Sequence, residues 1–130
     1  MSFTYNFNDN LIYNTKLAVV GSRNFNDYNQ LKNTINNIRL SYPNINTIVS
    51  GGAIGADKLS EVYAHEFQLQ TIIFQPEWNK YGKKAGILRN KDIICNADIV
   101  VAFWDGKSPG TKNSIELANV HQKKLFVVHF

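Results

Sequence analysis

Short apolar runs alternate with segments of helical spacing along most of the chain. The runs are rich in β-branched residues, which predicts buried strands, and residues such as Leu31, Ile35 and Ile38 recur at the spacing of an amphipathic helix. The predicted strands are Leu17–Val20, Ile45–Ser50, Thr71–Phe74, Ile99–Phe103 and Leu125–Val128. The predicted helices are Tyr28–Leu40, Ala56–Phe67, Lys83–Asn96 and Thr111–His121.

This alternation predicts an α/β, Rossmann-like three-layer fold: a mainly parallel sheet of about five strands with helices on both faces. Residues 16–130 form one predicted domain. Residues 1–15 precede it, and the alternation of Phe3, Tyr5 and Phe7 with polar residues favours an extended arm or edge strand, with a flexible tail as the alternative.

The formal charge of +4 and the pI of about 9.2 favour anionic partners such as phosphates or nucleic acid. The positive residues are scattered, and the densest groups are only Lys83-Lys84 and Lys123-Lys124. A solvated basic surface is therefore the competing interpretation, and a nucleic-acid partner rests on charge alone.

A single cysteine, Cys95, cannot form an internal disulfide and indicates a reducing, cytoplasmic compartment. Its apolar neighbours predict that it is buried. No basic segment precedes an apolar one as in a signal peptide, and the longest apolar stretch, Ala97–Trp104, is too short for a membrane span. No cofactor motif or metal-ligand set is predicted.

Glycine and hydroxyl residues gather directly after the predicted strands. In open α/β sheets, ligands bind at the carboxyl ends of the strands. If the strand order is 3-2-1-4-5, the loops after the first, second and fourth strands are neighbours and form one cleft. Backbone N–H groups in such loops, and at the helix N-termini that follow, can hold a phosphate.

The loop after the first strand reads Gly21-Ser22-Arg23, and Arg23 can contact a phosphate through two N–H groups. The second loop runs from Ser50 to Asp57 and has the glycines of an anion nest, without the lysine and hydroxyl of a P-loop. Asp57 has two interpretations: a cap or first-turn acid of the following helix, or a ribose contact or catalytic carboxylate.

After the third strand, Trp78 can stack on a base or cap the core, and Arg89 lies on the next helix. After the fourth strand, a Gly/Ser/Thr loop opens the last helix, with Thr111 as a candidate cap. The predicted ligand-binding residues are Gly21, Ser22, Arg23, Ser50, Gly51, Gly52, Gly55, Ala56, Asp57, Trp78, Arg89, Asn90, Trp104, Asp105, Ser108, Gly110 and Thr111.

These motifs together resemble the YspA-like family of the SLOG superfamily, named for the Smf/DprA and Lonely Guy proteins. The resemblance covers about residues 16–130 and includes Gly21-Ser22-Arg23, Ser50–Asp57, Trp78, Ala85–Asn90 and Ala102–Thr111. It implies a Rossmann-like fold, recognition of nucleotides or their derivatives, and a homo-oligomer. Relatives include phosphoribohydrolases, DNA-binding proteins and ligand sensors in antiviral systems.

One departure from the Lonely Guy enzymes concerns catalysis. They carry a glutamate three residues after the threonine of P-G-G-x-G-T, where this chain has Ser114; Glu116 lies two residues further, about 200° around the helix. Arg89 matches the enzymes' active-site arginine. The candidate catalytic residues are therefore Asp57, Glu77, Arg89 and Glu116, with no positioned carboxylate assigned.

The sequence therefore predicts a binding module, a sensor or sequestering protein for a nucleotide or nucleotide-derived ligand. The alternative is an N-glycosidic hydrolase acting on a nucleotide or an ADP-ribose-like compound.

Overall fold

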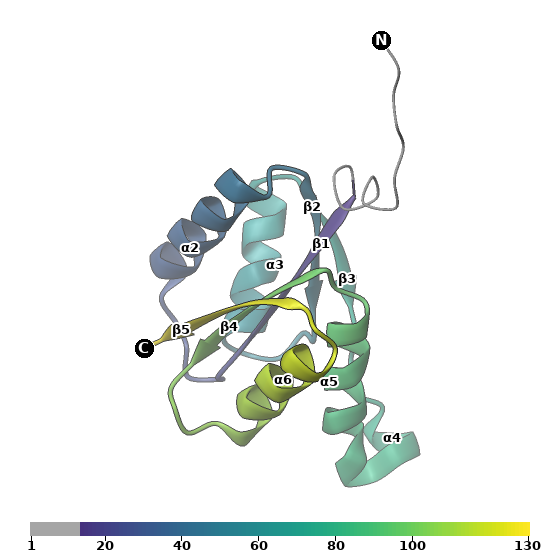
Figure 1. Cartoon of the computed structure of the whole chain (residues 1–130). Helices are drawn as coiled ribbons and strands as arrows, with labels where there is room; N and C mark the ends of the chain where they lie inside the picture. The colour runs from purple at the N-terminus through teal and green to yellow at the C-terminus, as the bar shows by residue number, and fades with distance from the viewer. Residues whose placement is uncertain (1–13) are drawn as a thin grey trace, which may run out of the picture.

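The structure, a computed structural model, describes residues 14–130 and has a five-stranded sheet at its centre (Figure 1). All strand pairs are parallel, in the order β3-β2-β1-β4-β5. The strands are β1 Thr15–Gly21, β2 Ile45–Ser50, β3 Gln70–Ile73, β4 Ile99–Trp104 and β5 Lys124–His129. The helices are α2 Tyr28–Ser41, α3 Ala56–Glu66, α4 Trp78–Tyr81, α5 Ala85–Cys95 and α6 Pro109–Val120, with the 3-10 turn η1 at Gly82–Lys84. The predicted fold is confirmed, and the observed strand order is the one on which the cleft prediction depended.

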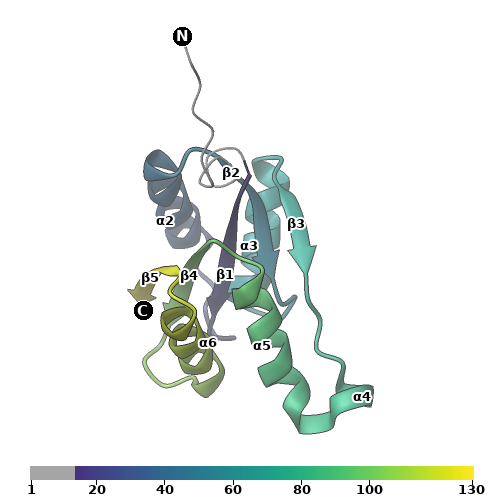
Figure 2. The same cartoon turned by 45° about the vertical axis from the view of Figure 1, so that its right-hand side comes forward.

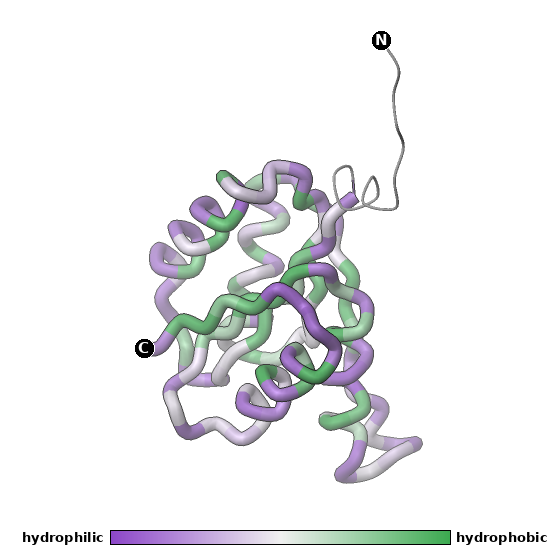
Figure 3. The backbone as a smooth tube through the Cα atoms, in the orientation of Figure 1, coloured by the Kyte–Doolittle hydropathy of each residue, from purple (hydrophilic) through white to green (hydrophobic). Residues whose placement is uncertain are grey.

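Two apolar layers hold the helices to the sheet. Successive side chains of a strand point to opposite faces, so Leu17 packs with the core under α2 and α3, while Ala18 packs with the core under α5 and α6. Figure 2 shows these helix pairs on opposite sides of the sheet, and Figure 3 shows hydrophobic residues concentrated along the central strands. The central strands are almost fully buried, which leaves loops at their ends for function.

The segment between β3 and α5 differs from the prediction. Trp78–Tyr81 forms a single helical turn, Gly82–Lys84 a 3-10 turn, and α5 begins at Ala85 rather than Lys83. One helical turn is too short for apolar periodicity to reveal. Figure 2 shows α4 projecting past the carboxyl end of the sheet, and we call Trp78–Lys84 the α4 arm.

Cys95 is exposed, so the prediction of a buried thiol is wrong. Ile93 and Ile94 form the buried face of α5, and the next residue lies about 100° further around the helix axis. The predicted aromatic arm at Phe3, Tyr5 and Phe7 lies outside the described residues. No helix within residues 14–130 is long and apolar enough to cross a membrane.

Candidate functional site

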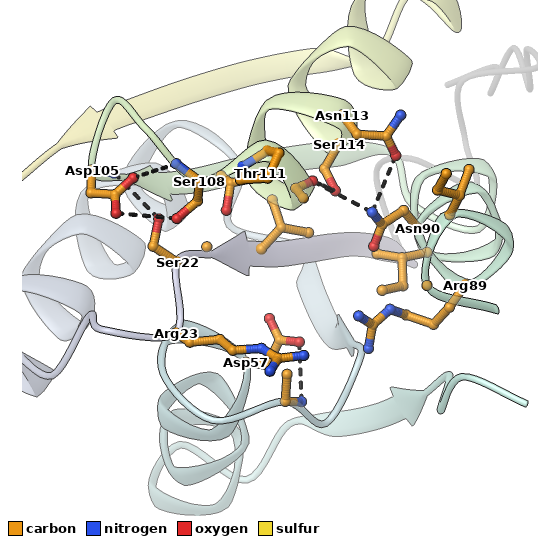
Figure 4. A pocket seen from close by; sticks show the side chains of 18 of the residues that line it. Ser22, Arg23, Asp57, Arg89, Asn90, Asp105, Ser108, Thr111, Asn113 and Ser114 are labelled. Atoms are coloured by element: carbon orange, nitrogen blue, oxygen red, sulfur yellow. Dashed lines mark hydrogen bonds between the residues drawn. The ribbon is translucent and has the colours of Figure 1, made fainter. Parts of the chain in front are cut away.

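A cleft of about 700 Å³ opens at the carboxyl ends of β1 and β4, between the start of α6 and the arm-side half of α5 (Figure 4). We call it the main cleft. The predicted residues that line it are Gly21, Ser22, Arg23, Asp57, Trp78, Arg89, Asn90, Asp105, Ser108, Gly110 and Thr111. The structure thus brings three of the predicted loops and α5 to one site.

A second cleft of about 310 Å³, the side cleft, lies against the loop after β2. Gly51 and Gly52 line it, together with Gln75 and Pro76. The two clefts share four lining residues, which are Arg23, Ala53, Trp78 and Arg89. The predicted residues Ser50, Gly55, Ala56, Trp104, Glu77 and Glu116 line neither cleft.

Asp105 organises the loop between β4 and α6. Its carboxylate accepts hydrogen bonds from the backbone N–H groups of Ser108 and Lys107, at 2.8 and 2.9 Å, and from the Ser108 hydroxyl at 3.1 Å. These bonds lower the pKa of Asp105 to about 2. Trp104 donates its indole N–H to the Ser108 carbonyl at 3.1 Å, so both residues shape the loop rather than offer a free ligand contact.

The same loop leaves the first turn of α6 without a side-chain cap. Ser108 precedes the helix, but its hydroxyl donates to Asp105 and does not accept from the helix N–H groups. Those N–H groups have no intrahelical acceptor. A Cβ added to Gly110 would meet no atom within 4 Å, so this turn presents open backbone to the main cleft. The arrangement favours an anion.

The loop after β2 differs from its prediction as an open anion nest. The N–H of Gly52 donates to the Ser50 hydroxyl at 3.1 Å, and the N–H of Ala53 donates to Asp57 Oδ2 at 3.2 Å. Two donors that a phosphate could use are therefore already bonded to the loop's own side chains.

Two glycines of the predicted set join loops rather than contact a ligand. A Cβ on Gly55, whose φ is +97°, would lie 2.5 Å from the Ser22 carbonyl oxygen. A Cβ on Gly21 would lie 2.6 Å from Ala56 Cβ. Only glycine permits this approach, which fixes the position of Arg23 relative to the start of α3.

Asp57 is buried beside Arg89 on the wall of the main cleft. Burial raises its pKa to about 6, while the hydrogen bond from Ala53 and the charge of Arg89 act in the opposite direction. Arg89 donates from Nη1 to the Gly51 carbonyl at 2.9 Å, and burial lowers its pKa, with a smaller contribution from the nearby charge of Arg23. Within residues 14–130, no group of three or more His, Cys, Asp or Glu side chains could hold a metal ion.

The sequence did not identify several residues that line the clefts. Asn113 accepts a hydrogen bond from the Asn90 side chain at 3.1 Å, and Lys83 comes from the α4 arm. Asn113 lies one turn into α6, beyond the glycine and hydroxyl residues that mark a phosphate loop. Only its proximity to Thr111 could have indicated it.

The candidate carboxylates separate into two groups. Glu77 and Glu116 are exposed and lie outside both clefts, whereas Asp57 lines the main one. Ser114 is buried in the main cleft, and its hydroxyl donates to the Gly110 carbonyl at 3.3 Å. The predicted separation of Ser114 and Glu116 onto different helix faces agrees with this placement.

Known proteins resemble this chain in sequence and in fold. The Gene 61 protein of Mycobacterium phage D29 is 35% identical over 77 residues, which is 55% of this chain and 62% of that protein, so this chain spans less than two thirds of its length. A solved structure of DNA processing protein A from Helicobacter pylori, described for its single-stranded DNA binding mode, has a TM-score of 0.67 and 26% identity. The match covers 92% of this chain and 67% of that one.

A family profile gives the most direct assignment. The profile for the YspA, cpYpsA-related SLOG family matches residues 15–81. The match begins at β1 and includes the loops that carry Gly21-Ser22-Arg23 and Ser50–Asp57. It spans over half of the 130 residues, and the chain therefore belongs to the YspA- and cpYpsA-related SLOG family.

Proposed function

We propose that the main cleft binds a nucleotide or nucleotide-derived ligand with a phosphate at the first turn of α6. The uncapped turn at Gly110 and Thr111, facing a cleft of about 700 Å³, is the observation that carries this proposal. The cleft volume is within the range of about 300–1,000 Å³ usual for small-molecule sites. The protein would act as a sensor or sequestering module, reading a nucleotide from the cytoplasm.

Trp78 is the candidate platform for the base. Its side chain is half-exposed, lines both clefts, and lies 3.5 Å from the position of a Cβ on Gly86. An exposed indole face can stack on any base. The side-chain amides of Asn90 and Asn113, which also line the main cleft, offer further polar contacts for a sugar.

The placement of the carboxylates supports binding over turnover by the Lonely Guy route. Ser114 has the position of that enzyme family's glutamate, and Glu116 faces away from the cleft. A hydrolase remains the second candidate because Asp57, with a pKa raised to about 6, is a buried acid in the cleft beside Arg89.

A nucleic-acid ligand is favoured by one further observation, the composition of the α4 arm. It carries Lys80, Lys83 and Lys84 beside the exposed rings of Trp78 and Tyr81. Cations interleaved with aromatic rings are typical of single-strand binding. The structurally similar DNA processing protein A is described for single-stranded DNA binding. A salt-dependent gel shift with single-stranded DNA distinguishes this partner from a small nucleotide.

Thermal shift with AMP, ADP-ribose and cyclic nucleotides tests the proposed site, with Gly110→Val as the key variant. A valine fits the open space at Gly110 but blocks close approach of a phosphate to the backbone. We expect the variant to keep the wild-type melting temperature and lose the ligand-induced shift.

The matched control is Asn119→Val, which places the same side chain on the exposed last turn of α6. Gly52→Val is less informative, because Gly52 has a φ of +73° and valine would strain the loop itself. An unchanged shift in folded Gly110→Val would contradict the proposed phosphate position.

A further inference from the structure

Two arginines converge on the wall that the main and side clefts share. Arg23 comes from the loop after β1 and Arg89 from α5, and Figure 4 shows their side chains extending toward one another. We propose that Arg23 and Arg89 form a second phosphate site, so that the ligand is a dinucleotide unit carrying two phosphates. This inference rests on the proposed function of the main cleft.

Arg89 has hydrogen-bonding capacity that the protein itself does not use. A guanidinium has five N–H donors. One donates to the Gly51 carbonyl at 2.9 Å, and Nε is buried without an acceptor in residues 14–130. Neither arginine takes part in an ion pair within the same residues. The donors of Arg23 and the remaining donors of Arg89 are therefore open to an external acceptor.

The positive charges of Arg23 and Arg89 on the shared wall also favour binding of an anion. Burial lowers the pKa of Arg89 most, the charge of Asp57 raises it, and the charge of Arg23 lowers it by a smaller amount. Asp57 is the acid that faces Arg89, but it accepts the Ala53 N–H and forms no ion pair with either arginine. A phosphate between the two guanidinium groups would remove their repulsion and accept from both.

The side cleft offers space for a second nucleotide. It holds about 310 Å³ beyond the arginine pair, and the Gln75 side chain lines it as a donor and acceptor for a base edge. Trp78 belongs to both clefts and therefore lies where two nucleotides would meet. A mononucleotide with its phosphate at α6 would leave the arginine wall and the side cleft empty.

The two phosphate positions lie on different walls of the cleft, which favours separated phosphates over a single group. One position is the first turn of α6, beyond β4, and the other is the wall formed by Arg23 and Arg89. Figure 4 shows the two positions on opposite sides of the cleft, with Thr111 and Ser108 on one side and Arg23 and Asp57 on the other. A phosphodiester-linked dinucleotide with a terminal phosphate offers such a pair.

Calorimetric titration with AMP, the 5′-phosphorylated diadenylate pApA and a longer 5′-phosphorylated oligoadenylate tests this inference. We expect wild-type protein to bind pApA at least about tenfold more tightly than AMP, as an added charged hydrogen-bonding site implies. Arg23→Gln should weaken pApA binding by about tenfold more than AMP binding and so remove this preference. Arg23 is exposed and makes no hydrogen bond within residues 14–130, so the variant should fold normally.

Arg39→Gln is the matched control, because Arg39 lies on α2 beside Tyr63, away from both clefts. Arg89→Gln should repeat the Arg23 result if its melting temperature is unchanged. Equal losses for AMP and pApA in Arg23→Gln, or no preference for pApA in wild type, would overturn the second site. Binding of the oligoadenylate more tightly than pApA, with both preferences lost in Arg23→Gln, would support the site and assign its dinucleotide unit to a strand. If Gly110→Val leaves AMP binding intact, the proposed function fails instead.

Discussion

Asp57 Oδ2 accepts a hydrogen bond from the backbone N–H of Ala53 at 3.2 Å. The first acid of α3 therefore bonds to the loop that precedes its own helix. Asp57 is thus a first-turn acid of α3, while its role as a ribose contact or catalytic carboxylate stays a prediction that its place on the cleft wall permits. It closes the loop after β2 with one oxygen while it lines the main cleft. Burial makes ionisation of the Asp57 carboxyl unfavourable, so the free energy of unfolding depends on pH through this group.

We expect Asp57→Asn to stabilise the protein at neutral pH. The pKa of Asp57 is raised from 3.8 to about 6, so the folded state binds the proton more tightly than the unfolded state. The stability contributed by this group is therefore full below about pH 4 and is lost as pH rises through about 6. The asparagine variant keeps an acceptor for Ala53 and has no such loss.

Urea unfolding of wild type and Asp57→Asn across pH measures this difference. The shift of about two pKa units corresponds to about 3 kcal/mol. The free energy of unfolding of the variant, relative to wild type, should rise by up to this amount between about pH 4 and about pH 7. Asp92→Asn, an exposed acid on α5, is the control and should show no comparable change. A pH-independent difference for Asp57→Asn would contradict the raised pKa.

Gly55→Ala should destabilise the fold strongly. Its φ of +97° is unfavourable for any side chain, and the added Cβ would lie 2.5 Å from the Ser22 carbonyl oxygen. We expect a loss of about 3 kcal/mol or more in the free energy of unfolding, because a backbone clash adds to the conformational cost. Gly82→Ala separates the two causes: its φ is +59° and no atom lies within 4 Å, so it should lose only about 1 kcal/mol. Equal losses in denaturant unfolding would show that the loop contact is unimportant.

The sequence predicted the strands and the edge that carries the site, because β-branched runs and parallel topology determine these features. The strand order entered only as a condition, because parallel topology alone allows other orders. The sequence also located Arg89 and Gly110 at the site. It could not distinguish glycines that face a ligand from those that join loops. Gly55 and Gly110 read alike in the sequence, but a Cβ clashes at the first and meets open space at the second.

The sequence also did not predict the hydrogen bonds that polar side chains of the loops form with one another. Ser108 and Asp105 were both predicted to bind ligand, and each satisfies the other across the loop after β4. Such short-range pairs depend on the loop conformation, which periodicity does not encode. The helical turn of the α4 arm was not predicted for a related reason, because one turn is too short to show a repeat of apolar residues.

We expect the protein to form at least a dimer. Trp78, Tyr81, Ile87 and Leu88 are apolar side chains with substantial exposure on the α4 arm and the adjoining part of α5. Exposed apolar side chains grouped along one segment of the chain are typical of an interaction site. Sedimentation velocity at micromolar to high micromolar concentration measures the assembly. A monomer throughout that range would contradict the prediction, and Ile87→Asp should weaken a dimer that uses this surface.

The prediction that separates the two function classes is ligand binding without turnover by the Lonely Guy route. The position of that route's glutamate holds a serine, Ser114, which has no carboxylate and whose buried hydroxyl donates to the Gly110 carbonyl. Loss of a positioned acid or base typically costs about 10²- to 10⁴-fold in rate. The phosphate contacts rest on other groups and should survive. A ligand at a hundredfold excess over its Kd should then stabilise the protein by about 2.7 kcal/mol.

Binding and cleavage can be measured in one sample after incubation with AMP, ADP-ribose and cyclic nucleotides. Thermal shift measures binding, and chromatography of free base and ribose phosphate measures cleavage. A stabilised protein with no product meets the prediction. Product over several turnovers, lost in Asp57→Asn, would establish the hydrolase with Asp57 as its acid. Glu77→Gln and Glu116→Gln are the controls, because both glutamates are exposed outside the clefts and should leave any cleavage unchanged. Loss of cleavage in Glu116→Gln would mean that α6 presents a different face to the bound ligand, since Ser114 and Glu116 lie about 200° apart around the helix.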